Sequence, residues 1–339
     1  MKAIGYRNSH AIDHLEALID IELPMPIASG HDLLVDVHAI SVNPVDTKIR
    51  RNGAPEAGEI RVLGWDAAGV VRAVGEKVTL FAPGDRVMYA GALLRPGTNS
   101  EQHLVDERIV GRAPTSIDFE AAAALPLTTI TAWELLFDRL QMPQGDADKP
   151  GTLLIIGAAG GVGSIMLQLA RKLTNWTVIG TASRSETRQW ATELGAHHVI
   201  DHGKPLSEQL KNIGIGEVDC VASLTHTDFH LPEIVASLAP QGKLALIDDP
   251  DALDVKLLKR KSISLHWEFM YTRSMFETTD MIKQHQLLNR VAQLIDEGVL
   301  RSTVTEYFGN INAANLRRAH ALLESGTARG KIVLSGFQY

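Results

Sequence analysis

The chain has 339 residues, of which 45% are hydrophobic, and this length suits two domains of ordinary size that each bury a core. The formal net charge of −7 argues against a nucleic-acid surface, which normally carries a basic patch, and the longest basic run is Lys259-Arg260-Lys261. The single cysteine, Cys220, excludes an intrachain disulfide and a zinc cluster built from thiolates. No secretory signal is visible, so we expect a cytoplasmic protein.

The first 120 residues contain short runs typical of β-strands, at 33–40, 67–74 and 85–90. Proline and glycine interrupt these runs, as they do between the strands of small β domains. We therefore predict a compact, mostly β first domain.

From residue 151 onward, apolar runs typical of strands alternate with helical segments, one of which spans 186–195 and ends at a glycine. This alternation predicts an α/β fold with a doubly wound parallel sheet, and six strands suit a complete dinucleotide-binding fold. Residues 151–170 carry no charge, but their five glycines favour a strand, a turn and a helix over a membrane span. The predicted strands are 153–157, 177–182, 198–200, 218–223, 243–248 and 262–267, with Cys220 in a buried strand.

The residues after 270 alternate between helical and strand-like patterns. We predict a helix over 281–298, a strand over 304–307, a helix over 313–325 and a final strand over 331–334. We expect this tail to return to the first domain.

Clustered glycines follow the predicted strand 153–157 and precede the helix-like residues from Ile165. This arrangement is typical of a dinucleotide-binding turn, where small residues let the backbone approach a pyrophosphate that the start of the helix stabilises. Gly163 lets helix and strand pack closely. Ala158 stands where the usual Gly-x-Gly-x-x-Gly pattern has its first glycine, so the motif alone is a weak signal.

Several segments together resemble the medium-chain dehydrogenase/reductase superfamily over essentially the whole chain. Within it, the chain looks most like the quinone oxidoreductase (zeta-crystallin) branch, and most of all like bacterial zinc-type alcohol dehydrogenase-like proteins. The resemblance implies a GroES-like catalytic domain over 1–124, completed by 271–339, and a Rossmann domain over 125–270. The segments that carry it are Ser41–Asp46, Gly64–Val71, Pro83–Val87, the glycine turn and Gly330–Leu334.

Zinc-dependent members of this superfamily bind catalytic zinc through a cysteine, a histidine and a later cysteine or acid. The matching positions here are Asn43, Trp65 and approximately Leu125, which cannot form a thiolate and imidazole site. The four-cysteine structural lobe is also missing. The pairs His10/His14 and His226/His230 have i,i+4 spacing, but 13 histidines produce such spacings by chance. We therefore predict no metal.

The end of the second Rossmann strand indicates which nicotinamide cofactor binds. Ser183, Arg184 and Arg188 follow this strand, and no acid stands there to bind the ribose 2′-hydroxyl of NAD. A hydroxyl and guanidinium groups suit the 2′-phosphate, so we predict NADPH. The alternative makes both arginines ordinary charges on a helix face.

The resemblance implies further cofactor contacts by position. Thr128 and Thr129 resemble a hydroxyl-bearing turn near the nicotinamide, although a helix N-cap role is an alternative. His266-Trp267-Glu268 should lie beside the carboxamide. The remaining expected cofactor contacts are Ala159, Gly160, Gly161 and Val162 at the pyrophosphate, His202 and Thr227 along the nucleotide, Ile247 and Asp248 at the nicotinamide ribose, and Lys331.

Without a Lewis acid, simple alcohol oxidation loses its main activation, whereas hydride addition to a quinone or an α,β-unsaturated carbonyl needs only modest stabilisation of a delocalised anion. We therefore predict a zinc-independent, NADPH-dependent quinone or enone reductase. In this interpretation Asn43 hydrogen-bonds beside nicotinamide and substrate, and Asp46 orients the loop. Lys48 stabilises an enolate, holds a phosphate or is exposed to solvent.

Aromatic and apolar residues supply a candidate pocket for a planar acceptor, with domain core as the alternative role for some of them. Two other functions stay open: a zinc-dependent alcohol dehydrogenase, and a non-catalytic NADPH-binding sensor or scaffold. The superfamily implies a homodimer or homotetramer, with no nucleic-acid or membrane partner. The predicted pocket residues are Trp65, Trp267, Phe269, Met270 and Tyr271.

Overall fold

The computed structural model describes residues 1–337, and the chain divides into two compact units. The first unit comprises Met1–Ile130 and Tyr271–Tyr339, and the second comprises Thr131–Met270. The division falls at Ile130, inside helix α3 (Pro126–Trp133), whereas the sequence analysis placed it at residue 125. No described helix is both long and apolar enough to cross a membrane.

The first unit is mostly β, as its sequence predicts, and contains two sheets. A small sheet has the order β2-β1-β4, and a seven-stranded sheet has the order β15-β16-β3-β5-β6-β8, with β7 paired to β3. Its strands are β1 (Lys2–Tyr6), β2 (Ile19–Glu22), β3 (Asp32–Val42), β4 (Arg61–Val62), β5 (Ala67–Val74), β6 (Arg86–Tyr89), β7 (Gln102–Asp106), β8 (Val110–Arg112), β15 (Val304–Tyr307) and β16 (Lys331–Ser335). Its helices, besides α3, are α1 (Pro44–Asn52), α2 (Phe119–Ala123), α9 (Thr272–Met275), α10 (Ile282–Asp296) and α11 (Ala313–Glu324).

Strand β3 organises this unit because it pairs with β5, β7 and β16. The approach of β5 to β3 requires glycine at position 69, since a Cβ there would lie 2.0 Å from the carbonyl oxygen of Asp36. The register of the two strands shifts next to this contact, between Val37 and Ala39. The β3 strand thereby brings its C-terminal end, and the residues that follow it, into the interior of the unit.

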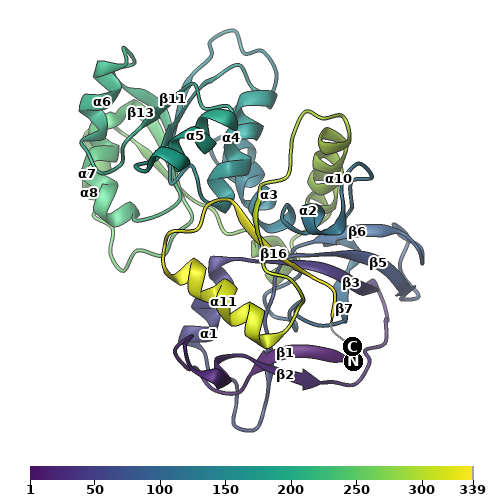
Figure 1. Ribbon diagram of the computed structural model, residues 1–339. Coiled ribbons are helices and arrows are strands. Elements are labelled where there is room, and N and C mark those ends of the chain that lie inside the picture. The colour runs from purple at the N-terminus through teal and green to yellow at the C-terminus, as the bar shows by residue number, and fades with distance from the viewer. Residues whose placement is uncertain (338–339) are drawn as a thin grey trace. The chain divides into compact units, whose positions relative to one another are not determined.

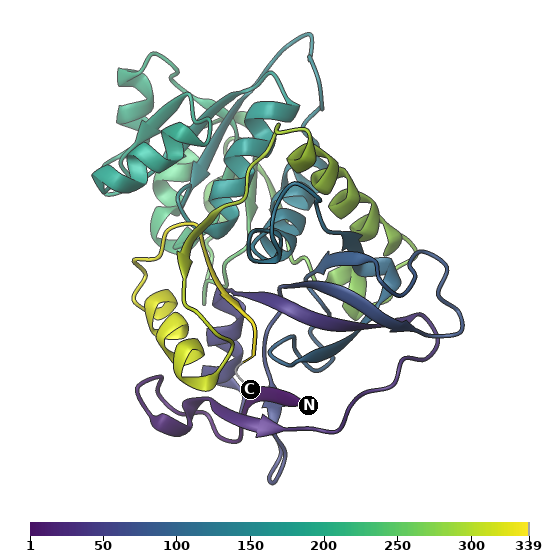
Figure 2. The ribbon, with the colours of Figure 1, turned by 45° about the vertical axis from the view of Figure 1, so that its right-hand side comes forward.

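The C-terminal segment joins the N-terminal half of the first unit. Strand β16 runs antiparallel to β3, with Val333 opposite Ser41. Helix α11, yellow in Figure 2, lies beside the N-terminal elements α1 and β2. The four tail elements lie within two residues of their predicted bounds.

The second unit is a doubly wound parallel sheet with the order β11-β10-β9-β12-β13-β14, which is the dinucleotide-binding order counted from β9. Figure 1 shows its helices lying along the sheet. Its strands are β9 (Thr152–Ile156), β10 (Thr177–Thr181), β11 (His198–Ile200), β12 (Val218–Ser223), β13 (Leu238–Leu246) and β14 (Ser264–Trp267). Its helices are α4 (Gly161–Leu173), α5 (Ser185–Glu193), α6 (Leu206–Asn212), α7 (Thr227–Ser237) and α8 (Lys256–Lys259), and Glu134–Arg139 forms a π-helix.

Two predicted strands of the second unit differ by more than one residue from their bounds in the structure. Strand β13 begins at Leu238 rather than 243, because Leu238 already pairs with Val218 before the register shifts. It ends at Leu246, which leaves Asp248 beyond the strand. Strand β14 begins at Ser264 because Ser262 has a φ of 51°, a left-handed conformation that does not continue a strand.

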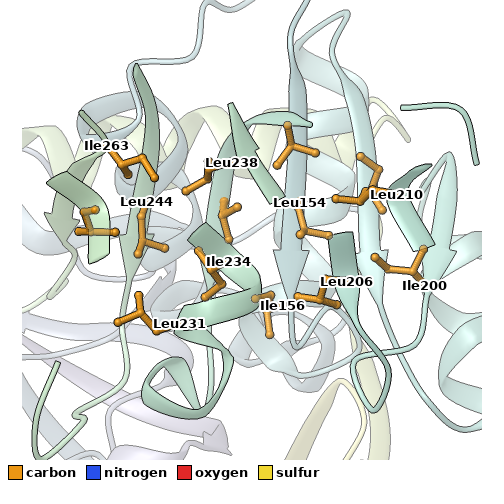
Figure 3. Packing of buried hydrophobic residues seen from close by; sticks show 14 residues of the cluster. Leu154, Ile156, Ile200, Leu206, Leu210, Leu231, Ile234, Leu238, Leu244 and Ile263 are labelled. Carbon is orange, nitrogen blue, oxygen red and sulfur yellow. The ribbon is translucent and has the colours of Figure 1, made fainter. Parts of the chain in front are cut away.

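One hydrophobic cluster of the second unit lies against one face of its sheet (Figure 3). Leu154 and Ile156 of β9 point toward side chains of α6 and α7. Cys220 is buried in β12, as predicted, and burial raises the pKa of its thiol to about 12. The labelled core residues are Leu154, Ile156, Ile200, Leu206, Leu210, Leu231, Ile234, Leu238, Leu244 and Ile263.

Candidate functional site

The glycine turn connects β9 to α4 at the carboxyl edge of the parallel sheet, where open α/β folds bind their ligands. Gly157 has a φ of 81°, and its N–H donates to Thr181 Oγ1 at 3.1 Å. A Cβ on Gly163 would lie 2.5 Å from the carbonyl oxygen of Gly157, so glycine is required there for helix and strand to meet. The four predicted pyrophosphate contacts, Ala159–Val162, lie at this turn and in the first residues of α4, whose leading N–H groups have no acceptor within the helix.

The end of β10 separates the two arginines that the sequence grouped together. Ser183 and Arg184 are exposed, and the Arg184 Nε lies 3.3 Å from Glu186 Oε1. Arg188 donates instead to the carbonyl oxygens of Ala182, at 3.1 Å, and Val199, at 2.8 Å. Arg188 therefore joins the ends of β10 and β11, whereas Ser183 and Arg184 face the solvent.

Polar side chains connect the carboxyl ends of β12 and β13. The hydroxyls of Ser223 and Thr227 lie 2.8 Å apart, and both are buried. Asp248 accepts hydrogen bonds from the Thr227 N–H, at 2.8 Å, and from its hydroxyl. Asp248 thus fixes the start of α7, while Ile247 beside it is half-buried.

His202 follows β11, and its ring lies edge-on to that of His230 on α7, 6.2 Å away. The Nδ1 of His202 is buried and has no hydrogen-bond partner among the described residues. Burial lowers the pKa of His230, so its ring is neutral at physiological pH. The two rings thus lie together at the carboxyl edge of the sheet.

The segment after β14 alternates between solvent and interior. Trp267 and Phe269 are about half exposed, at 53% and 47%, whereas Glu268 and Met270 are buried. Arg139 Nε donates to Glu268 Oε2 at 2.8 Å. The buried carboxyl of Glu134 lies on the same side, 3.8 Å from the Arg139 guanidinium.

In the first unit, Asn43 follows β3 and caps α1, with its N–H donating to Asp46 Oδ2 at 2.7 Å. Its side-chain Nδ2 donates to Asp66 Oδ2 at 2.8 Å, and its Oδ1 accepts from the Lys331 ammonium. Lysine only donates and a carboxylate only accepts, so these partners orient the Asn43 amide unambiguously.

The Lys331 ammonium is the centre of this buried cluster. It donates to Val42 O at 3.0 Å, to Asn43 Oδ1 and to Asp66 Oδ2 at 3.0 Å, which uses all three of its N–H groups. The other Asp66 oxygen accepts from the N–H of Leu127 at 2.8 Å. Lys331, predicted as a cofactor contact, therefore reaches the rest of the site through Asn43 and Asp66.

Burial raises the pKa of both carboxyls in this cluster. The pKa of Asp46 rises to about 7, mainly because burial penalises its charge, although Asn43 and Lys331 act in the opposite direction. Burial also raises the pKa of Asp66, opposed by Lys331, Asn43 and Leu127. Every contact of Asp66 is a donor, which suits its ionised form, whereas one oxygen of Asp46 has no partner among the described residues. The structure therefore favours Asp46 as the protonated member.

Three other predicted residues of the first unit have distinct positions. Lys48 is exposed on α1. Thr128 and Thr129 are buried inside α3, which begins at Pro126, so the alternative N-cap role is wrong. The Thr129 hydroxyl has no hydrogen-bond partner among the described residues, whereas Thr128 donates to Leu125 O at 3.3 Å.

The predicted apolar pocket draws its residues from both units. In the first unit, Trp65 and Tyr271 meet edge to face with centroids 6.5 Å apart, and both are buried. Burial, together with Asp46 and Asp66, raises the pKa of Tyr271 well above its ordinary value, so its hydroxyl keeps its proton. Trp267, Phe269 and Met270 belong to the second unit, and a pocket that combines all five residues stays a prediction.

The residues at the metal position of this fold do not suit zinc. Asn43 is a poor ligand, Trp65 and Leu125 are buried and cannot ligate, and the Lys331 ammonium already takes the oxygens of Asn43 and Asp66. A positive charge at this point also repels a second cation.

Among the described residues, one group of potential ligands is close enough for a metal: His10, His14 and Glu16. His14 Nδ1 accepts the N–H of Glu16 at 3.1 Å, which requires the tautomer that carries its proton on Nε2. Metal-bound histidines instead donate from their second nitrogen, so this loop is not arranged for a metal. The other spaced pair, His226/His230, joins an exposed residue to a buried one.

Sequence reasoning missed Asp66, Glu134 and Arg139. Asp66 belongs to the segment Gly64–Val71, which the family resemblance already singled out, so an acid directly before a buried apolar strand was an available signal. Glu134 and Arg139 lie in a helical stretch whose charges look like an ordinary solvent face. The burial of Glu134 and the contact of Arg139 with Glu268 distinguish them only in the structure.

Comparison with known proteins agrees with this fold. The description "Alcohol dehydrogenase GroES-like domain" matches residues 29–115, and "Zinc-binding dehydrogenase" matches residues 194–334. A zinc-type alcohol dehydrogenase-like protein of Staphylococcus epidermidis is 40% identical over 99% of both chains. A quinone oxidoreductase of Lama guanicoe is 27% identical over 98% of this chain and 97% of its own.

Two crystal structures are also similar. One, from Rhizobium etli, is of a protein provisionally called a zinc-dependent alcohol dehydrogenase; its TM-score is 0.96 at 56% identity, covering 100% of this chain and 99% of that one. The other is Escherichia coli quinone oxidoreductase complexed with NADPH, with a TM-score of 0.83 at 27% identity over 99% and 100% of the chains. The chain belongs to the medium-chain dehydrogenase/reductase superfamily and is an oxidoreductase of this type that uses a nicotinamide cofactor.

Proposed function

We propose that this protein transfers hydride from NADPH to a quinone or an α,β-unsaturated carbonyl compound, without zinc. The observation that carries the proposal is the cluster around Lys331, whose ammonium takes the oxygens of Asp66 and of Asn43, the residue that the family resemblance matches to a zinc ligand. A reductase without a Lewis acid requires a substrate whose reduced anion is already delocalised. Quinones and conjugated enones meet this requirement, and saturated aldehydes do not.

The exposed pair Ser183 and Arg184 supports NADPH over NADH, because a hydroxyl and a guanidinium favour a 2′-phosphate. No acid occupies the end of β10, although Glu186 one turn later pairs with Arg184. The 2′-phosphate would replace this carboxylate as the partner of Arg184. The relative from Escherichia coli, whose structure contains NADPH, agrees with this choice.

When bound, the nicotinamide supplies the hydride, and the residues of the first unit organise the acceptor. Both N–H groups of the Asn43 amide are used, because its Nδ2 donates to Asp66 and, at 3.4 Å, to Ser41 O. We infer that Asn43 does not donate a hydrogen bond to a developing oxyanion. Asp46 holds the turn that carries Asn43, and Trp65 with Tyr271 provides an apolar wall.

Steady-state assays test this function with NADPH and three acceptors of similar size: a quinone, a conjugated enone and a saturated aldehyde. We expect turnover of the first two, unchanged by a zinc chelator, and no zinc in elemental analysis of protein without a histidine tag. Higher kcat/KM for the aldehyde, lost on chelation, would indicate a zinc-dependent alcohol dehydrogenase. NADPH binding without turnover of any acceptor would indicate a sensor or scaffold.

A further inference from the structure

The segment Trp267–Met270 has a buried acid where its alternation calls for an apolar side chain. Trp267 and Phe269 face outward, whereas Glu268 and Met270 face inward. The Glu268 N–H donates to Leu246 O at 3.0 Å, which extends the pairing of β13 and β14 by one residue and holds the inward orientation. A carboxyl in such a position must be hydrogen-bonded or neutral.

Among the residues that the structure describes, Glu268 meets a second buried carboxyl and one cation, Arg139. The side chains of Glu134 and Glu268 are both fully buried, and they interact with each other through a hydrogen bond. Arg139, with a third of its side chain exposed, donates to Glu268 at 2.8 Å but stays 3.8 Å from Glu134. Two carboxylates in contact cannot both ionise when a single, partly hydrated guanidinium faces them. A hydrogen bond between them requires a proton on one oxygen.

The surrounding elements supply no further neutralising charge. Lys243 on β13 donates to the carbonyl oxygen of Leu140 at 2.7 Å and does not reach the pair. Burial lowers the pKa of His266 on β14, with Lys243 and Arg139 acting in the same direction, so this ring stays neutral. The pair therefore depends on Arg139 and on its own proton.

The backbone carrying Glu134 is unusual as well. Glu134–Arg139 is a π-helix, a rare conformation that is frequent at functional sites. It places Glu134 and Arg139 together against Glu268, so that one wide turn contacts the segment after β14 through two side chains.

We propose that Glu134 and Glu268 share one proton and, with Arg139, form a latch that holds Trp267–Met270 in the conformation that binds the nicotinamide end of the cofactor. The three are positioning residues, and the inference rests on the proposed role of this segment beside the carboxamide. Burial and the neighbouring Glu134 raise the pKa of Glu268 to about 9. Above this pH the proton leaves to water, the two carboxylates repel each other and the latch loosens.

Infrared spectroscopy of the whole protein, labelled with ¹³C in the glutamate carboxyls, tests the shared proton without any cofactor. The label separates these groups from Asp46, which also titrates near neutrality. We expect the carbonyl band of a protonated glutamic acid at pH 7, lost with a midpoint of about 9. Glu268→Gln should remove the band, because its amide occupies the position of the protonated acid. Glu134→Gln should move the midpoint down, and Glu208→Gln, an exposed control in the same unit, should leave the band unchanged.

Cofactor titrations test the consequence. If only the protonated latch binds the nicotinamide end, the wild-type dissociation constant for NADPH should rise about tenfold from pH 8 to pH 10. The reason is that about a tenth of the protein keeps the shared proton at pH 10. Glu268→Gln should change less than about twofold over the same range. The adenosine fragment 2′,5′-ADP, which lacks nicotinamide, should bind wild type equally at both values.

Absence of the band from wild type at pH 7 would overturn the proposal, whether or not the variants fold. An equal loss of NADPH affinity in wild type and Glu268→Gln, or a parallel loss for 2′,5′-ADP, would also overturn it. Failure of the proposed function has a different signature, which is no binding of NADPH or NADH at any pH.

Discussion

In the first unit, Asp46 and Asp66 lie around the Lys331 ammonium, whereas in the second unit Glu134 and Glu268 lie around the Arg139 guanidinium. Both clusters contain two buried carboxyls and one cation, so their formal charges are the same. The cations differ, because Lys331 is buried with three acceptors and Arg139 is a third exposed.

The different exposure of the two cations affects which carboxyl of each cluster keeps its proton. A fully bonded ammonium stabilises the ionised Asp66 and leaves Asp46 to titrate at about 7. Burial and the neighbouring Glu134 raise the pKa of Glu268 to about 9, and the partly hydrated guanidinium of Arg139 only partly offsets them. Burial therefore raises the pKa of a carboxyl in each cluster, and the position of the cation modifies the result.

The largest effect is expected from removing the buried cation. Lys331→Met leaves Asp66 and Asn43 without their shared donor, and the unpaired buried charge should reduce the free energy of unfolding by about 3–5 kcal/mol. Urea denaturation measures this loss. Lys77→Met, an exposed control in the same unit, should change stability by less than about 0.5 kcal/mol.

The double variant Lys331→Met/Asp66→Asn sharpens the same test. Replacing the Asp66 carboxylate, which Lys331→Met leaves unpaired, should restore part of the lost unfolding free energy, because no unpaired buried charge remains. A single variant as stable as the Lys77→Met control would contradict the assignment of Lys331 as the cluster's central cation.

An exposed cation should affect ligand binding instead of stability. Arg184→Ala removes a charge-assisted bond to the 2′-phosphate, which should weaken NADPH binding by about 1.5–3 kcal/mol, roughly ten- to a hundredfold, with little change for NADH. Fluorescence titration with both cofactors measures the difference.

Arg188→Ala is the matched comparison for Arg184→Ala, since Arg188 holds two backbone carbonyls. It should lower stability and weaken both cofactors together. Equal affinity of the wild type for NADH and NADPH would overturn the phosphate assignment.

The two clusters should also differ in how stability depends on pH. The folded pKa of Asp46, about 7, lies above its ordinary value of 3.8, so the native state holds an extra proton between them and stability falls as pH rises through this range. Glu268 acts in the same direction, up to about 9. Asp46→Asn should remove up to about 1.4 kcal/mol per pH unit of slope below pH 7, and Glu268→Gln should do so up to pH 9.

Chemical denaturation at pH 5, 7 and 9 gives these slopes as differences from wild type, so that the contributions of other groups cancel. Identical slopes for wild type and both variants would mean that neither acid keeps its proton in the fold.

The smallest effect is expected from zinc. If Lys331 fills the metal position, added zinc should shift the melting temperature of untagged protein by less than about 1 °C, because a ligand stabilises only the state that binds it. Thermal unfolding with and without a chelator measures this shift. A rise of several degrees that survives His14→Ala would place zinc at the Lys331 cluster after all.

Much of the fold could be predicted from the sequence, because strand periodicity, glycine turns and helix ends depend on neighbours a few residues apart. Strands β5, β12 and β15 have the bounds expected from their apolar runs, and the glycine turn lies between β9 and α4. Trp65 and Asn43 already argued against zinc, since ligand chemistry is a property of the residue itself.

Only the tertiary structure decided how the charged residues pair. Asp66 and Lys331 are 265 positions apart, and Arg139 and Glu268 are 129 apart. No local sequence pattern indicates that residues so far apart in the chain will pair. The structure likewise separated Arg184 from Arg188, which the sequence placed in one group, because the carbonyl of Val199 that holds Arg188 belongs to another strand. A side chain's charge and role depend on its burial and on the partners it meets, and the chain sets both only when distant segments pack together.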